Sequence, residues 1–275
     1  VATPFHLYEL MRPDHPLLRQ LQIKAPGSYQ HSVVLANLVE AAAESVGADS
    51  LLARAGAYFH DVGKTQRPAF FIENQLAGHN PHEGLEPVDS ARIIVAHVAD
   101  GLALGRRHRL PERLLDFIRE HHGRTRVEFF FRQALARQPA GQAVDEEAYR
   151  YPGPSPRSRE TAILMLADGA EASVRAAEAA GVDAIDAVVG RVIQARLEAG
   201  ELDDSGLSLG DLQRVRGAFV ETLRGMYHPR IRYPEGLQPQ LESAAYAPAG
   251  ALAEARTASN ADPAIDAQSP QASGA

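Results

Sequence analysis

The sequence has no cysteine among its 275 residues, which excludes disulfides and thiolate metal sites. It also lacks any apolar run near the roughly 18 residues that a membrane-spanning helix needs. A secretory signal is missing as well, because Pro4, His6 and Glu9 interrupt the start of the chain. Basic charge is not in excess: the net charge of −7 offers no cationic surface to long nucleic acid. A small phosphorylated ligand remains compatible, since local cations or metals can bind it.

The composition is that of an ordinary globular protein, with 45% hydrophobic and 23% charged residues. This length is enough for one large domain or two small ones with a sizeable core. The chain begins with Val1 rather than Met. We therefore interpret it as a fragment of a longer protein, which leaves room for a membrane anchor upstream.

Proline, glycine and capping residues divide the middle of the chain into helices. The first should be capped by Ser28 and end at Gly47. Further helices are predicted at about 50–61, 89–100 and 111–123, with two or three more between about 159 and 225. Gly101 should end the helix at 89–100, and strand signals are scarce. The pattern predicts an all-α fold, a helical bundle with long connecting loops.

The chain divides into three parts by composition. Residues 1–24 form a lead-in that Pro13 interrupts, and residues 25–234 carry the helical pattern. Residues 235–275 are rich in Ala, Pro, Ser and Gln and are predicted to be disordered. Inside the domain, the proline-bearing stretch 138–158 should be a long loop, and such loops are often functional.

Histidines and aspartates recur on the apolar faces of the predicted helices. Asp168, for example, lies three and four residues after Met165 and Leu164. Because positions i, i+3 and i+4 share one face of a helix, such a side chain points toward the core. Six residues follow this pattern: His31, His60, Asp61, His97, His121 and Asp168.

Each of these residues alone has a simpler explanation. A lone histidine on an apolar face is more often a hydrogen-bonded core residue than a ligand, and a cap or an arginine could neutralise Asp168. Together, however, four histidines and two aspartates would be hard to satisfy in a core without a shared partner. Divalent metal ions supply that partner, and imidazole with carboxylate suits Mn, Fe, Co or Zn better than Ca or Mg. Asp61 could bridge two ions through its two oxygens.

The same residues follow a known pattern. His31, the pair His60-Asp61 and Asp168 match the H…HD…D arrangement of HD-domain phosphohydrolases. Longer strings resemble the cytoplasmic HD domain of seven-transmembrane HD proteins, the PgpH-type cyclic di-AMP phosphodiesterases, over about residues 10–234. These strings are GAYFHDVGK at 56–64, FFIENQ at 70–75, NPH at 80–82, HVADG at 97–101, HHG at 121–123 and YPGP at 151–154.

This resemblance implies an HD-superfamily fold and an enzyme that hydrolyses cyclic di-AMP to linear pApA at two divalent transition-metal ions, Mn or Fe. One metal would be held by His31, His60, Asp61 and Asp168, and the other by Asp61, His97 and His121. The resemblance also implies the cytoplasmic domain of an integral membrane protein, attached to the membrane only through an upstream region. Whether the domain forms homo-oligomers is left open.

The implied mechanism uses a hydroxide shared by the two metals, which attacks phosphorus in line with the leaving 3′-oxygen. Asp61, Lys64 and His122 are the predicted catalytic residues, with Lys64 stabilising negative charge on the phosphate; a solvated lysine past a helix end is the alternative. Lys64, Arg124 and Tyr151 are the predicted substrate contacts, and Tyr151 would stack on a base. His122 should point about 100° away from His121 on a helix, so packing or capping is an equal alternative.

Two other functions compete with this one. The first is an HD nucleotidase or phosphatase for another nucleotide, such as a nucleoside monophosphate or (p)ppGpp. The second is a non-catalytic nucleotide-sensing module, although such a module should have lost ligands that are all present here. The HD-GYP class for cyclic di-GMP is disfavoured, because Gly123-Arg124-Thr125 follows His121-His122 in place of Gly-Tyr-Pro.

Overall fold

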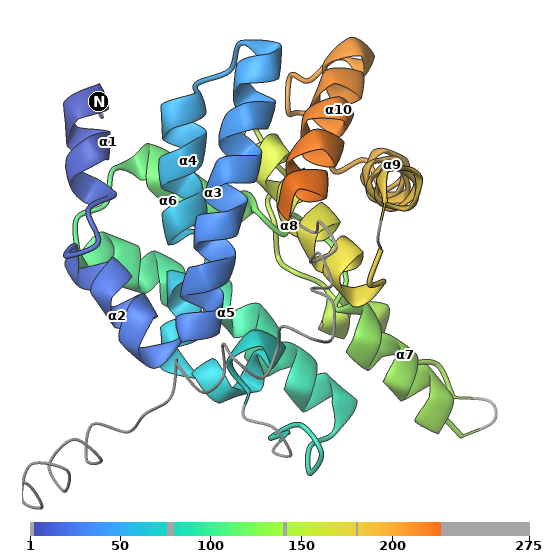
Figure 1. Cartoon of the computed structure of the whole chain (residues 1–275). Helices are drawn as coiled ribbons and strands as arrows, with labels where there is room; N and C mark the ends of the chain where they lie inside the picture. The colour runs from blue at the N-terminus through green and yellow to red at the C-terminus, as the bar shows by residue number, and fades with distance from the viewer. Residues whose placement is uncertain (1–2, 76–79, 140–141, 180, 227–275) are drawn as a thin grey trace, which may run out of the picture. The chain divides into compact units, whose positions relative to one another are not determined.

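The computed structural model describes residues 3–75, 80–139, 142–179 and 181–226 (Figure 1). Within these ranges it has ten α-helices, four short 3₁₀-helices and one isolated bridge between Arg126 and Arg150, with no longer strand. The prediction of an all-α fold is therefore confirmed. The predicted disordered tail, residues 235–275, lies outside the described residues.

The chain starts with two short helices, α1 (Pro4–Leu10) and α2 (Pro16–Lys24), each with proline in its first turn. Proline is favoured there because the missing N–H would have had no helical partner. Leucines of both helices are buried in the main hydrophobic cluster: Leu7, Leu10, Leu17 and Leu18. Residues 4–24 thus pack as part of the bundle, while the proposed boundary at residue 24 stays a prediction.

The central helix is α3 (Pro26–Val46), which Gly47 ends as predicted with a φ of +69°. Ser28 is not its N-cap: Ala25 occupies that position and Ser28 lies inside the first turn. The capping acceptor comes instead from a distant loop, because the Asn74 side-chain oxygen accepts the Ser28 N–H at 3.2 Å and that of the preceding residue at 2.9 Å. A local sequence pattern cannot reveal such a cap.

Helix α4 (Ser50–Phe59) begins after the N-cap Asp49 and ends two residues before the predicted limit at Asp61. The chain then turns tightly through three 3₁₀-helices: η1 (Val62–Gln66), η2 (Pro68–Phe70) and η3 (Ile72–Asn74).

Helix α5 (Pro87–Arg107) is longer than predicted, and Gly101 lies inside it. A Cβ on Gly101 would lie 3.3 Å from the backbone nitrogen of Gly63 and 2.9 Å from Ile118. This glycine therefore permits close packing of α5 against η1 and does not end the helix.

Six further elements complete the described chain: α6 (Glu112–Glu120), α7 (Glu128–Arg137), η4 (Glu146–Tyr149), α8 (Arg159–Ala176), α9 (Val182–Glu198) and α10 (Leu209–Met226). Pro111 is the N-cap of α6, and that helix ends at Glu120 rather than at Gly123. Helix α7 was not predicted, whereas the three helices from α8 to α10 were. The predicted loop 138–158 contains η4.

The core is organised around α3, which contacts α4, α8 and α10 (Figure 1). Helix α8 is buried along the whole apolar run 162–167, because it lies between α3, α4, α6 and α9. Helix α5 packs on η1 and α6. The elements expected to carry metal ligands are thus neighbours. None of the helices in the described ranges combines the length and the apolarity needed to cross a membrane.

Candidate metal centre

The six predicted ligands and His122 form one cluster at the middle of these helices. His31 comes from α3 and His97 from α5, while Asp168 comes from α8. The others follow helix ends: His60 and Asp61 come after α4, and His121 and His122 come after α6. The imidazole centroids of His60 and His121 are 5.1 Å apart, and those of His31 and His60 are 5.6 Å apart. Five separate segments therefore deliver polar groups to one buried place.

One group of candidate ligands consists of His31, His60 and Asp61, whose ligand atoms all lie within 4.8 Å of one another. Asp168 extends this group, since its Oδ1 lies 3.1 Å from His31 Nε2. These four residues are the set expected to hold one metal, and the structure brings them together. Their role as ligands stays a prediction.

The second group consists of His97, His121 and His122, again within 4.8 Å. His122 was expected to point away from His121, and that orientation is wrong: the two ring centroids are only 4.0 Å apart. The helical spacing does not apply, because α6 ends at Glu120 and both histidines lie in a turn. His122 is thus a further candidate ligand.

Two carboxylates lie between the groups. Asp61 Oδ2 is 3.2 Å from His60 Nε2, while its Oδ1 is 3.5 Å from His97 Nε2 and 3.7 Å from His121 Nε2. Asp168 does the same on another side, with Oδ1 near His31 and Oδ2 3.8 Å from His122 Nδ1. Both aspartates are therefore placed to connect two ions, where the sequence suggested this only for Asp61.

The hydrogen bonds of three histidines fix their tautomers. Nδ1 of His60, His97 and His121 lies 2.8, 2.6 and 3.0 Å, respectively, from a backbone carbonyl oxygen of the preceding turn. A carbonyl oxygen only accepts, so Nδ1 must carry the proton, and in a neutral ring Nε2 is left with a lone pair. Nε2 of His97 and Nε2 of His121 face each other at 3.2 Å. Two lone pairs at this distance repel unless a cation lies between or beside them.

Two buried atoms at the centre have no hydrogen-bond partner among the described residues: His60 Nε2 and Asp61 Oδ1. A buried acceptor without a donor costs about 1–3 kcal/mol, so such atoms need an explanation. The nitrogen and oxygen donors here fit a divalent transition metal, and the fixed tautomers present the lone pairs it requires. The residues present therefore fit the metal group that the sequence predicted.

The protonation states of His97, His121 and Asp61 agree with that interpretation. Burial, with the neighbouring histidine charges, lowers the pKa of His121 to about 3, and burial lowers the pKa of His97. Burial would raise the pKa of Asp61, but the charges of His60 and Lys64 outweigh it and hold that pKa well below its ordinary value. Neutral imidazoles and ionised carboxylates are the forms that bind metals.

His31 differs from the other histidines because two carboxylates face it. Its Nδ1 lies 3.0 Å from Glu171 Oε2, and its Nε2 faces Asp168. Burial lowers the pKa of His31, but these two hydrogen bonds outweigh it and raise the pKa to about 10. Glu171 thus orients this imidazole through its outer nitrogen, as carboxylates commonly do for metal-bound histidine.

Lys64, a predicted catalytic and substrate-binding residue, lies beside the cluster. Its Nζ is 2.7 Å from Asp61 Oδ2 and 2.9 Å from Glu73 Oε1, and its side chain is only 14% exposed. The alternative of a solvated lysine is therefore wrong. Burial opposes its charge, but the two carboxylates prevail and raise the pKa of Lys64. A contact from Lys64 to a substrate phosphate stays a prediction.

The other predicted substrate contacts line a neighbouring cavity of about 920 Å³. Tyr151 is buried there and stacks on His122, with ring centroids 4.2 Å apart and planes 27° apart. The His122 imidazole thus covers one face of the Tyr151 ring, and only the other face could stack on a base. Base stacking by Tyr151 stays a prediction. The backbone N–H of Arg124 is held by Glu201, and its side chain is exposed at the cavity wall.

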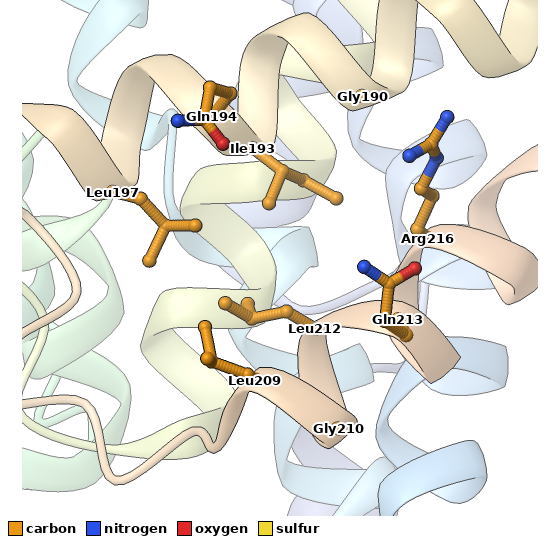
Figure 2. Close-up of a pocket in the computed structure, with 9 residues that line it drawn as sticks. All are labelled: Gly190, Ile193, Gln194, Leu197, Leu209, Gly210, Leu212, Gln213 and Arg216. Carbon is orange, nitrogen blue, oxygen red and sulfur yellow. The ribbon is translucent and has the colours of Figure 1, made fainter.

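A second cavity, of about 400 Å³, lies between α9 and α10 (Figure 2). Aliphatic side chains such as Ile193 and Leu212 point into it, and the charged residue of its wall, Arg216, is paired with Asp186. Its wall has neither the histidines nor the carboxylates that mark the metal cluster. It is therefore not the candidate functional site.

Three glutamates around the site were missed by sequence reasoning. Glu171 lies three residues after Asp168 on α8, and this spacing was the signal that could have found it. Glu73 accepts hydrogen bonds from the Lys64 ammonium and the Ser28 hydroxyl. Glu201 accepts one from the backbone N–H of Arg124, in the turn after His122. The contacts of Glu73 with Ser28 and of Glu201 with the turn join residues far apart in the chain, which a local pattern does not show.

Comparison with known proteins identifies the family. Residues 28–173 match the family model described as HD domain. The chain belongs to the HD domain family. It is 43% identical over 235 residues to the cyclic-di-AMP phosphodiesterase PgpH of Bacillus subtilis and 40% identical over 235 residues to that of Listeria monocytogenes, with 86% of this chain covered in each comparison. The chain spans about a third of the length of these relatives, 33% and 32%.

A solved structure of an HD domain is also similar. The crystal structure of the L. monocytogenes PgpH HD domain in complex with cyclic-di-AMP matches with a TM-score of 0.75 and 38% identity. The match covers 78% of this chain and 100% of that one. The resemblance noted from the sequence strings and the HD helical fold are both confirmed.

Proposed function

We propose that this HD domain is a metal-dependent phosphodiesterase that hydrolyses cyclic di-AMP to linear pApA. The relatives named as cyclic-di-AMP phosphodiesterases support this substrate, as does the similar HD domain crystallised with cyclic-di-AMP. The observation that carries the proposal is the convergence of fixed-tautomer imidazoles with Asp61 and Asp168 at one point. No role for these groups in an ordinary core explains lone pairs that face one another.

We propose that the donor set would divide between two ions. His31, His60 and Asp168 would hold one, and His97 and His121 the other, with Asp61 between them; His122 is placed to join the second set. When bound, two divalent ions supply Lewis acidity toward a phosphate oxygen and a water that ionises near neutral pH. Mn or Fe is proposed, and elemental analysis of protein purified without added metal tests this.

The chain's own groups would then bind and orient the substrate. The imidazole and carboxylate shell would hold the cations beside which one phosphate binds, and the Lys64 ammonium, held by Asp61 and Glu73, would add positive charge at that side. The ring stack of His122 and Tyr151 joins the cluster to the cavity, because His122 belongs to the cluster and Tyr151 lines the cavity. Positioning and charge stabilisation are the main contributions that a protein makes to phosphoryl transfer.

The test is to incubate metal-loaded protein separately with cyclic di-AMP, cyclic di-GMP, AMP and ppGpp, and to resolve the products. Linear pApA from cyclic di-AMP at the highest kcat/KM supports the proposal. Faster turnover of AMP or ppGpp would favour the nucleotidase alternative, and binding without turnover of any would favour the sensing module. The Asp61→Ala variant should lose both metal and turnover; near-normal activity in it would contradict the bridging role.

The cellular setting is proposed on the same basis. We infer that the domain acts at the cytoplasmic face of a membrane, because its sequence strings resemble those of seven-transmembrane HD proteins. The relatives it matches are about three times as long, which is compatible with such a longer chain. Fractionation of cells that express the full-length protein tests this. Recovery of the full-length protein in the soluble fraction instead of the membrane fraction would contradict this inference.

A further inference from the structure

An arginine that no sequence pattern indicated lies beside the metal cluster. Arg196, on the last turns of α9, has a buried Nε with no hydrogen-bond partner among the described residues. Its guanidinium makes no ion pair within the described chain either, although Asp168 and Glu201 are its electrostatic neighbours. A buried guanidinium donor without an acceptor is unfavourable, so an arginine held in this way is suited to an anionic ligand.

A glycine on α8 leaves room for the Arg196 guanidinium beside the metal cluster. Gly169 follows Asp168 directly, and a Cβ on Gly169 would lie 3.7 Å from Arg196 Nη2. The arginine therefore crosses α8 at the residue next to a candidate metal ligand. It stands close to the cluster without contacting the ligand atoms.

Arg196 also lines the cavity of about 920 Å³ whose wall includes Tyr151, which stacks on His122 of the cluster. This volume lies within the range of about 300–1,000 Å³ typical of small-molecule sites. The wall has three other arginines: Arg126 pairs with Glu128 and Glu146, Arg150 pairs with Glu146, and Arg124 is exposed at the rim. Arg196 is thus an inner cation of this cavity that is available for a ligand.

The proposed substrate has an anion that the metal cluster leaves unpaired. A cyclic dinucleotide carries two phosphodiester groups, and only one of them can be attacked at a time. The second needs a counter-charge in the adjoining space, and a guanidinium can bind phosphate oxygens through two parallel N–H groups. Resting on the proposed function, we propose that Arg196 binds the phosphodiester group of the cyclic dinucleotide that is not being hydrolysed.

The test compares substrates with one and two phosphate groups. Arg196→Gln should raise the KM and the Kd for cyclic di-AMP about 10- to 100-fold, the range for a lost charged hydrogen bond. The same variant should hydrolyse bis(p-nitrophenyl) phosphate, which has a single phosphodiester, within about twofold of the unchanged protein. Its melting temperature should not fall, because Nε has no partner to lose. Arg191→Gln is the matched control: it removes the same charge from an exposed position of α9 outside this cavity.

Each outcome decides the inference. An unchanged KM and Kd for cyclic di-AMP in Arg196→Gln would overturn it while leaving the phosphodiesterase function intact. An equal loss on both substrates would also overturn it, since Arg196 would then act on the metal cluster or the attacked phosphate. If the unchanged protein does not hydrolyse cyclic di-AMP, the proposed function fails. The inference is then judged by Kd alone: weaker binding in the variant supports it, and no binding by the unchanged protein rejects it.

Discussion

Gly63 offers a sharp test of how the fold sets the geometry of the metal centre. It follows the His60-Asp61 pair in η1, where η1 packs against α5. A Cβ at this position would lie 1.9 Å from the carbonyl oxygen of His97 and 2.6 Å from the Gly101 nitrogen. Both are backbone atoms, so no side-chain rotation relieves the clash. The Gly63→Ala change must push α5 away from η1.

The size of the effect follows from these distances. The contact with the His97 oxygen is about 1 Å shorter than the 3.0 Å below which real Cβ contacts are essentially never found. Overpacking of this kind costs about 1–3 kcal/mol, which lowers the melting temperature by about 2–12 °C for a domain of this size. The same displacement would widen the 3.5 Å between His97 Nε2 and Asp61 Oδ1. A misplacement of about 1 Å can reduce turnover about 100-fold.

The assay is a thermal melt, a metal analysis and a rate measurement on each variant. Gly217→Ala is the control, because Gly217 is exposed on α10 and a Cβ there would meet nothing within 4 Å. This control should keep its activity and gain about 0.5–1 kcal/mol from reduced freedom of the unfolded chain. A Gly63→Ala protein with unchanged melting temperature, metal content and turnover would refute the reasoning.

Three further predictions concern the carboxylate that orients His31, the metal itself, and a hydrogen bond at the start of α10. Glu171→Gln should weaken metal binding about 10- to 100-fold because the carboxylate that orients His31 becomes a neutral amide; chelator competition measures this, and unchanged affinity would contradict it. Removing metal with a chelator should abolish hydrolysis of cyclic di-AMP, and adding Mn should restore it; full activity in the chelated protein would refute metal dependence. Hydrogen bonds from Ser208 hold the pKa of Asp211 at about 2, so its ionised form stabilises the native state above the unfolded pKa of about 3.9. Asp211→Asn should therefore be less stable at pH 7, with the difference from the unchanged protein fading as pH falls from about 4 toward 2; a difference that persists at pH 2 would count against this origin.

The metal ligands on helix faces could be predicted because the helical repeat is local. His31, His97 and Asp168 lie inside α3, α5 and α8, and their spacing from apolar neighbours gave their direction. His122 could not be placed in this way, since α6 ends before it and a turn brings its ring against His121.

Contacts between distant segments could not be predicted either, because a local pattern does not show how two elements pack. The cap of α3 comes from Asn74, and the closeness of Gly63 and Gly101 depends on how two elements pack. Gly101 looked like a helix stop because glycine ends many helices, yet here it serves the packing of α5. No sequence pattern indicated Arg196. It stands out only in the folded chain, because its buried Nε has no hydrogen-bond partner among the described residues.

The short segment that holds Glu73 and Asn74 contacts α3, which carries one candidate ligand, and η1, which directly follows another. Asn74 caps α3, the helix that carries His31. Glu73 accepts hydrogen bonds from the Lys64 ammonium, which lies beside Asp61, and from the Ser28 hydroxyl. Surface loops usually accept insertions and sequence drift. Here a one-residue insertion would move the start of α3 and break the ion pair that holds the Lys64 ammonium. We therefore expect this segment to be among those where an insertion harms the protein most.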